Sequence, residues 1–397
     1  MANSLLTPTA VTRESLRVLH QKLNFVGAIT RDYDDSYAKS GAKIGDTLKI
    51  RLPNQYTVRS GATLAAQDVT ESSVSLRVAT QKGVDLNFTS VDLTLSLDNF
   101  SKRIIEPAMS VLAANIEADA LSMYKGVYQS VWNGGAAATY NKALDARVLL
   151  QRSLTPSNNR TMLLDPQAMA DVIKDTKTLF QDQASIAKQF KEGMVGRAAG
   201  FDWGENTLLP SHLRGASAAT TGDSTTFITA NQPVSQIAVP LGAGTFKNGD
   251  VFTIANVFSA HAETKASTGQ LQQFVVTADY AGGAGNLLFA PAVYVSGAKQ
   301  NVVVSSTSAT ATLTPAGTAS TAVQTGLAFQ KGAFAFATAD LVMPSGVDFA
   351  AREVMDGLSM RIVRAYDINN DQFPCRLDLL YGYQTLRAAL AARYHNN

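Results

Sequence analysis

The spacing of apolar residues near the N-terminus predicts an amphipathic helix of about four turns that begins close to Thr9. One face carries apolar side chains and the other carries basic ones, namely Leu16, Leu19 and Leu23 against Arg13, Arg17 and Lys22. Such a helix can lie as an arm on a neighbouring surface, or it can pack on its own domain. The sequence leaves both alternatives open.

Residues 44 to 95 change to the alternating period of β-strands. Strands are predicted over Thr47 to Leu52, Val74 to Val78 and Val91 to Leu95. The stretch from Asn54 to Thr70 has few large apolar residues and cannot bury much surface by itself. We therefore expect an extended, hairpin-like excursion that projects or docks on a partner.

From Asp98 the helical period returns and predicts the longest helix of the chain. Pro107 lacks an N–H group, so the main helix should begin with this residue in its first turn. The Asn133-Gly134-Gly135 triplet should end the helical region.

Residues 141 to 213 have a mixed α/β pattern. A helix is predicted over Lys142 to Ser153 and a short strand over Thr161 to Leu164. Asp165 followed by Pro166 is a specific start signal for a further helix, because Asp caps free N–H groups and Pro suits the first helical position.

The composition shifts between Gly215 and Gln330, where only seven of 116 residues are charged. Short β-rich runs recur there between turns, which is typical of an all-β barrel or sandwich. Small-residue segments at 215–223 and 314–326 bound the region and are expected to be the linkers of an inserted domain.

After Gly332 the mixed pattern resumes. Strands are predicted over Phe334 to Phe336, Leu341 to Met343, Met360 to Val363 and Leu377 to Leu380, followed by a final Ala-rich helix over Gln384 to Arg393. The return of strands after the insertion indicates one discontinuous α/β domain that carries the β-module in a loop.

Composition narrows the functional classes. The chain has 397 residues, with 34 Lys and Arg against 32 Asp and Glu, a balance that argues against a dedicated nucleic-acid binder. The single cysteine, Cys375, excludes a disulfide scaffold and a cysteine-built zinc site. The N-terminus lacks a secretory pattern, and the apolar runs are too short to span a bilayer, so we expect no contact with a membrane.

Candidate chemistry is sparse. The four histidines lie far apart in the sequence, and residues 367–378 copy a calcium loop except that Gln372 replaces its turn glycine and Pro374 interrupts it. The acidic cluster of residues 32–35 is more simply a solvated loop, and Cys375 a small buried apolar group. The residues therefore predict no catalytic, cofactor or metal site, and they favour an interaction protein.

Several short motifs resemble, in order, the coat protein of the short-tailed Salmonella phages. They are Arg103-Ile104, Leu112-Ala113, Asn115, Glu117 and Met123 in the long helix, Ala199 to Asp202, Asn248 to Asp250 inside the insertion, and Cys375 to Gly382. The resemblance spans nearly the whole chain and implies an α+β fold of the Hong Kong 97 capsid type.

By this resemblance, the chain divides into the parts of that fold. They are an N-terminal arm at 1–45, an extended loop at 46–95, a peripheral domain with the spine helix at 96–135 and 327–350, an axial α/β domain at 136–221 and 351–397, and an inserted all-β barrel at 222–326.

The implied function is a non-enzymatic major capsid protein that forms pentamers and hexamers of an icosahedral shell around double-stranded DNA. The implied partners are further copies of the chain, a scaffolding protein and a portal during assembly in the bacterial cytoplasm, and DNA held nonspecifically. Within this hypothesis, the assembly residues are Arg13, Leu16, Arg17, Leu19, Lys22 and Leu23. The alternatives are another virion component, such as a tail or fibre protein, and a hydrolase using the acids near Asp32 or Asp367.

Overall fold

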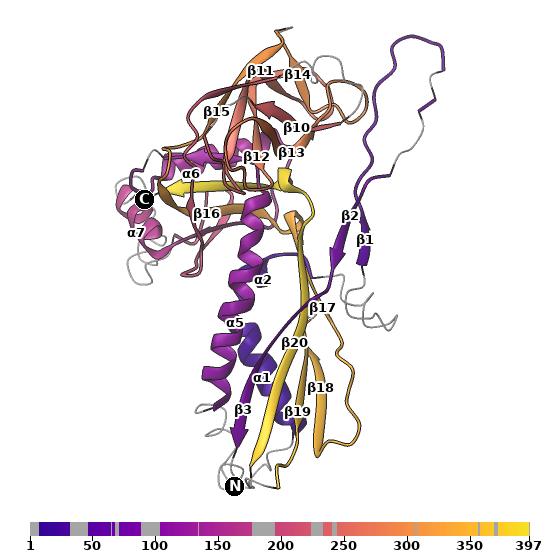
Figure 1. The fold of residues 1–397 in the computed structure, drawn as a ribbon, viewed down its shortest axis with the longest axis vertical. Coiled ribbons are helices and arrows are strands. Elements are labelled where there is room, and N and C mark those ends of the chain that lie inside the picture. The colour runs from indigo at the N-terminus through magenta and orange to yellow at the C-terminus, as the bar shows by residue number, and fades with distance from the viewer. Residues whose placement is uncertain are drawn as a thin grey trace. The chain divides into compact units, whose positions relative to one another are not determined.

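A computed structural model of the chain (Figure 1) divides into two compact units, each built from separate stretches of sequence. Unit 1 comprises Met1–Ile50, Val74–Leu121 and Phe334–Leu386, and unit 2 comprises Arg51–Ser73, Ser122–Ala333 and Arg387–Asn397. The structure describes residues 8–31, 47–64, 66–67, 71–88, 104–133, 135–176, 195–223, 233–239, 244–305, 308–355, 358–368 and 372–396.

Unit 1 is an antiparallel sheet covered by helices. The sheet has the order β17-β20-β19-β18, and β3 pairs with β20 on its other edge. The strands are β3 (Thr80–Phe88), β17 (Phe334–Ala339), β18 (Phe349–Met355), β19 (Leu358–Arg364) and β20 (Phe373–Thr385). Helices α1 (Pro8–Lys22) and α5 (Glu106–Leu121) contact this sheet and each other. Pro107 lies in the first turn of α5, as predicted.

Helix α1 confirms the predicted amphipathic helix and shows where its apolar face lies. Leu16, Leu19 and Leu23 are at most 6% exposed, and α1 packs on β18, β19 and α5. The structure therefore matches the alternative in which this helix packs on its own domain. Arg13, Arg17 and Lys22 are exposed.

A buried carboxylate joins α5 to the segment that follows α1. Glu117 is 2% exposed, and its oxygens accept the backbone N–H groups of Asn24 at 3.1 Å, of Val26 at 3.3 Å and of Phe25. These donors belong to the first turn of the short helix α2 (Phe25–Ala28), where free N–H groups favour a negative charge. Glu117, one of the motif residues, thus caps α2 from a different helix.

The predicted hairpin-like excursion begins and ends in a two-stranded ribbon of β1 (Thr47–Arg51) and β2 (Ser73–Arg77). Ile50 and Leu76 are buried in a cluster with residues of β17 and β20. Between the strands, Val58 and Leu64 are 94% and 83% exposed. The strand predicted over Val91 to Leu95 lies outside the described residues.

Unit 2 contains a mixed sheet, here called the carrier sheet, in the order β4-β21-β16-β5-β7-β6 with β8 paired to β16. Its strands are β4 (Ser130–Trp132), β5 (Arg160–Leu164), β6 (Arg197–Ala198), β7 (Phe201–Glu205), β8 (Ser211–Leu213), β16 (Ala322–Gln330) and β21 (Ala391–Asn396). Helices α6 (Tyr140–Arg152) and α7 (Pro166–Thr176) share its core. The start signal for α7 is confirmed, because the Asp165 carboxylate accepts the N–H of Ala168 at 3.3 Å.

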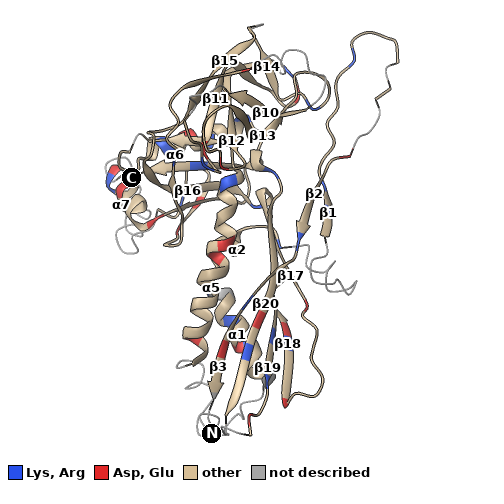
Figure 2. Cartoon of the chain, viewed as in Figure 1, with Lys and Arg blue, Asp and Glu red and all other residues tan. Residues whose placement is uncertain are grey.

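The inserted region is all-β, as the sequence predicts. It forms a sheet in the order β10-β13-β12-β11-β15-β9, in which β14 also pairs with β11 and the two end strands, β9 and β10, contact each other. The strands are β9 (Thr220–Asp223), β10 (Val234–Val239), β11 (Val251–Ala260), β12 (Ser267–Val276), β13 (Gly285–Val293), β14 (Val302–Val304) and β15 (Thr310–Pro315). These strands are mostly tan in Figure 2, in keeping with the low charge of this region.

The helix predicted over Gln384 to Arg393 is wrong. Strand β20 continues to Thr385, a short 3-10 helix spans Ala388–Leu390, and Ala391–Asn396 form strand β21. Strand β21 lies between β16 and β4, and all six of its residues are buried. The helix propensity of alanine amounts to less than about 1 kcal/mol per residue, so sheet pairing on both sides outweighs it.

The predicted linker over 314–326 is also wrong in its second half. Residues 322–330 form β16, which pairs with β21, β5 and β8. Its small residues serve close packing rather than flexibility, because a Cβ on Gly326 would come within 2.6 Å of the Leu164 side chain. The inserted domain therefore ends near Pro315 and not at residue 326.

Three further assignments differ in the structure. The helical region ends with a 3-10 helix over Ser122–Gly126 and not at Asn133, because Ser130–Trp132 form strand β4. Residues 341–343, predicted as a strand, have no regular secondary structure, whereas Phe349–Met355 form β18. Residues 351–386, which the resemblance assigns to the axial domain, belong to unit 1 with α5. The reason is sheet pairing, since β20 pairs with β3, β17 and β19, which are all in unit 1.

Candidate functional site

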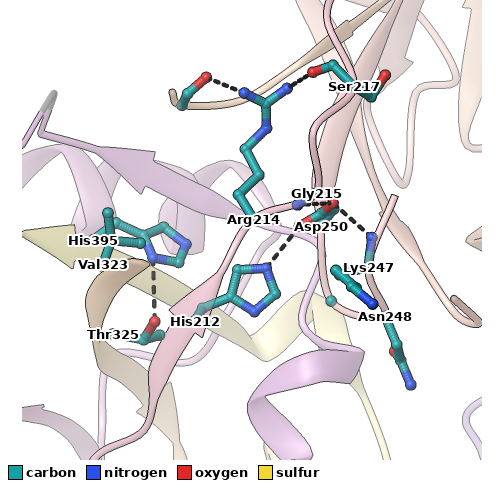
Figure 3. A network of polar contacts seen from close by, with 12 residues as sticks. His212, Arg214, Gly215, Ser217, Lys247, Asn248, Asp250, Val323, Thr325 and His395 are labelled. Atoms are coloured by element: carbon teal, nitrogen blue, oxygen red, sulfur yellow. Dashed lines mark hydrogen bonds and ion pairs between the residues drawn. The ribbon is translucent and has the colours of Figure 1, made fainter. Parts of the chain in front are cut away.

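A buried polar cluster lies where the inserted domain joins the carrier sheet, and we call it the junction (Figure 3). Its central group is Asp250, which is 2% exposed and immediately precedes β11. One carboxylate oxygen accepts the N–H groups of Gly215 at 3.0 Å and Lys247 at 2.8 Å, and the other accepts Nε2–H of His212 at 2.8 Å. A buried carboxylate needs such donors, so these bonds determine how the turn before β11 sits.

His212, on β8 of the carrier sheet, continues this chain of bonds. Its Nδ1 lies 3.1 Å from the hydroxyl of Tyr124. With the proton on Nε2, the imidazole donates to Asp250 and accepts from Tyr124, so that one tautomer satisfies all three side chains. Gly249 is required beside it, since φ is +101° and a Cβ there would lie 3.1 Å from the imidazole.

Arg393 lies on β21, another strand of the carrier sheet, and contacts the same turn before β11. It is fully buried, and its Nη1 donates to the Gly249 carbonyl at 2.6 Å. Its guanidinium lies 5.8 Å from the Tyr124 ring centroid. Burial lowers the pKa of Arg393 to about 10, although Tyr124 and Asp250 oppose the shift. The side chain therefore remains charged at neutral pH.

Arg214 holds together the two chain segments that enter and leave the inserted domain. Its Nη1 donates to the carbonyl of Gly317 at 2.7 Å, and its Nη2 donates to the carbonyl of Ser217. Ser217 precedes β9 and Gly317 follows β15. The side chain of Gln273, on β12, adds a third link, because it exchanges two hydrogen bonds of 2.8 and 2.9 Å with the backbone of Ser130 on β4.

The hydrogen bonds of the junction hold the inserted domain against the carrier sheet, and its side chains offer no reactive group. Burial raises the pKa of Tyr124, so its phenol stays protonated at neutral pH. Burial, followed by the charge of Arg393 and the nearby His212, lowers the pKa of His395 well below its ordinary value. In the described part of the chain, no group of three His, Cys, Asp or Glu side chains has the arrangement of a metal site.

The other candidates from the sequence do not join this cluster. Asp367 forms a turn with Gln372, and Asp378 is buried in bonds to Arg361 at 2.7 Å and Arg376 at 3.1 Å, which leaves the calcium pattern without its last ligand. Cys375 is buried, and burial raises its pKa to about 12, as expected of an inert thiol. The acidic residues at 32–35 lie outside the described residues.

Sequence reasoning missed the junction as a site. His212 and Asp250 are 38 residues apart, and no local spacing relates them. The available signal was the Asn248-Gly249-Asp250 motif, which supplies both the carboxylate and the turn. Within the described ranges, no helix combines the length and apolar character needed to cross a membrane.

Comparison with known proteins identifies the family. The family model described as P22 coat protein, gene protein 5, matches residues 35–392 of this chain. No curated protein matches the sequence.

The chain is similar to three solved phage structures, and each likeness is distant. A chain from Mycobacterium phage Che8 is 11% identical over 94% of this chain and 90% of that one, with a TM-score of 0.48. The capsid structure of the cyanophage P-SCSP1u is 11% identical over 90% and 84%, with a TM-score of 0.44. The mature capsid of bacteriophage PhiM1 is 12% identical over 88% and 82%, with a TM-score of 0.42.

The family model carries the identification, because it spans most of the sequence and includes α5, the inserted domain and the carrier sheet up to the start of β21. It does not support a tail or fibre protein or a hydrolase. The chain belongs to the P22 coat protein family and is a major capsid protein of a tailed bacteriophage, which forms the icosahedral shell of the virion.

Proposed function

We propose that copies of this chain assemble as pentamers and hexamers around double-stranded DNA and that the subunit acts without catalysis. A scaffolding protein and a portal take part in assembly, which occurs in the host cytoplasm, and DNA contacts are nonspecific. The observation that carries the proposal is the junction, because its charged groups bond within the subunit and hold the inserted domain in place. A net charge of +2 also limits repulsion between copies.

The basic face of α1 is the proposed contact of the arm with a neighbouring subunit or a scaffolding protein. Arg13, Arg17 and Lys22 are exposed, whereas the three leucines among the predicted assembly residues are buried inside unit 1. Arg17 already pairs with Glu14 at 2.6 Å on the same helix, so a partner would compete with this pair. Such exposed pairs contribute about 0.2–1 kcal/mol, which an acidic partner can replace.

Electron microscopy of the expressed chain, alone and with its scaffolding protein, tests the proposal. We expect closed shells built from pentamers and hexamers in at least one condition. Only monomers or fibres in both conditions would overturn it. Replacing Arg13, Arg17 and Lys22 together by Gln should reduce the yield of shells, whereas replacing Arg197, an exposed cation of unit 2, should not.

The role of the inserted domain is part of the same proposal. We propose that the inserted domain supports folding of the subunit. Deleting residues 222–326 would also remove part of β16, so the sharper deletion joins residues 218 and 317 with a short glycine linker. We expect insoluble or misassembled protein, and normal soluble shells would show that the inserted domain is dispensable.

A further inference from the structure

A cleft of about 300 Å³ lies in unit 2 beside strand β12. Its lining includes side chains from β12, from the end of α6 and from the segments before β4 and β14, among them Gln129, Arg152, Gln270, Gln272, Lys299 and Gln300. The junction uses none of these six side chains. A cleft of this size accommodates a short stretch of peptide or a small molecule.

The cleft runs along an edge of β12 that, in the described part of the chain, has no neighbouring strand at Gln270 to Gln273. There the Gln273 carbonyl accepts Nε2–H of the Gln272 side chain at 2.9 Å, a bond that an added strand would displace. Four consecutive residues, Gln270 to Gln273, line it, and successive side chains of a strand point to opposite faces, so the cleft meets the edge and not one face. On that side β12 pairs with β13 only at Val275 and Val276. The ladder stops after Ala290 because Pro291, which also lines the cleft, has no N–H to donate.

A buried acceptor in the lining has no partner among the described residues. Gln129 is 4% exposed, and its Nε2 donates to Ser153 Oγ at 2.6 Å and to the Ala389 carbonyl at 3.0 Å. Its Oε1 accepts no hydrogen bond. A buried carbonyl oxygen that accepts no hydrogen bond favours a ligand that offers an N–H group.

The charges of the lining are of one sign. Arg152 and Lys299 are its ionised side chains, and no Asp or Glu of the described chain lines the cleft. A ligand with carboxylates therefore matches the lining better than a neutral or basic one.

We propose that this cleft binds an extended peptide segment with acidic side chains, which adds to the open edge of β12. The strand edge and Gln129 Oε1 pair with the peptide backbone, and Arg152 and Lys299 pair with its carboxylates. A nucleic-acid backbone supplies anions but no N–H groups, so it fits the lining less well. The proposal concerns the unassembled subunit and does not depend on shell formation.

Fluorescence anisotropy with a labelled Thr-Asp-Thr-Asp-Thr peptide tests this proposal on the full-length, unassembled chain. We expect saturable binding that is about tenfold weaker for Thr-Asn-Thr-Asn-Thr and about tenfold weaker for the R152Q/K299Q double variant. The control variant K247Q removes a cation of the inserted domain outside the cleft and should bind as the unsubstituted chain does. Thermal unfolding of each variant shows that it remains folded.

Hydrogen exchange locates the peptide. Strand addition should slow exchange of backbone amides within Gln270 to Gln273, and a merely electrostatic contact would leave them unchanged. Equal binding of the Asp and Asn peptides, or unchanged binding to the double variant, would overturn the proposal. Preferential binding of a thymidine decanucleotide at the same residues would do so too, since it would assign the cleft to nucleic acid.

Discussion

The interior of the inserted domain and its junction with the carrier sheet are stabilised by opposite means. Inside, Phe252, Phe274 and Phe289 are at most 2% exposed, and their ring centroids lie 5.1 to 5.9 Å apart. At the junction, buried positions hold Asp250, His212 and other charged or polar groups. Apolar burial contributes more free energy but is not directional, whereas hydrogen bonds set one orientation. The comparison indicates that the interior provides stability and the junction provides placement.

The largest expected effect is on the interior. Phe252→Ala removes a ring that contacts two others, and we expect it to lower the free energy of unfolding by about 3–5 kcal/mol in urea titrations of the subunit. Leu288→Ala is the matched control, since Leu288 lies in the same sheet but is 43% exposed. An equal loss for both variants would contradict the distinction.

Asp250→Asn should have the next largest effect, because it removes the charge that His212 and two backbone N–H groups face. We expect a loss of about 2–3 kcal/mol. Unlike Phe252→Ala, it should also speed proteolysis in the segments at 215–219 and 316–321, because the inserted domain loses its placement. Glu263→Gln, an exposed acid of the same domain outside this turn, is the control; faster cleavage there as well would argue against a specific role for the junction.

The junction should also make stability depend on pH through His395, whose pKa is lowered in the folded chain. The unfolded chain then binds the proton more readily, so this contribution is complete above about pH 6.5 and is lost as the pH falls below it. The slope for one proton is at most about 1.4 kcal/mol per pH unit. Urea titrations between pH 5 and 7.5 should show a smaller slope for His395→Gln than for His261→Gln; equal slopes would exclude His395 as the source.

The smallest effect is expected at the surface of the same turn. Lys247 pairs with Asp279 at 3.2 Å, but both side chains are at least half exposed. We expect Lys247→Gln to change the free energy of unfolding by less than about 0.5 kcal/mol. A loss above about 1 kcal/mol would show that burial does not explain why the buried contacts stabilise the subunit more than this exposed pair.

Local signals in the sequence predicted much of the fold. The Asp165-Pro166 start of α7, the position of Pro107 and the β-rich insertion all depend on neighbouring residues, and the structure confirms them. The failures came where tertiary context decides. Ala391 and Ala392 favour a helix by composition, yet they lie in strand β21 because they pair with Ala328 and Phe329 of β16.

The candidate site was less accessible to sequence reasoning. The pairing of His212 with Asp250 depends on where the inserted domain docks, and no spacing encodes this. The arm helix was predicted correctly as amphipathic, but its period is the same whether the apolar face meets a neighbour or its own sheet. Only the packing of Leu16, Leu19 and Leu23 on unit 1 separates these cases.

The bonds of Arg214 have a consequence for engineering. Both of its acceptors, at Ser217 and Gly317, are backbone carbonyls, which every amino acid supplies. The two hydrogen bonds of Arg214 thus fix how far apart the segments that enter and leave the inserted domain lie, but they place no requirement on the side chains between them. A foreign domain with closely spaced termini could replace residues 218–316 as a displayed cassette, provided that it supplies a carboxylate to His212 and a carbonyl to the buried Arg393.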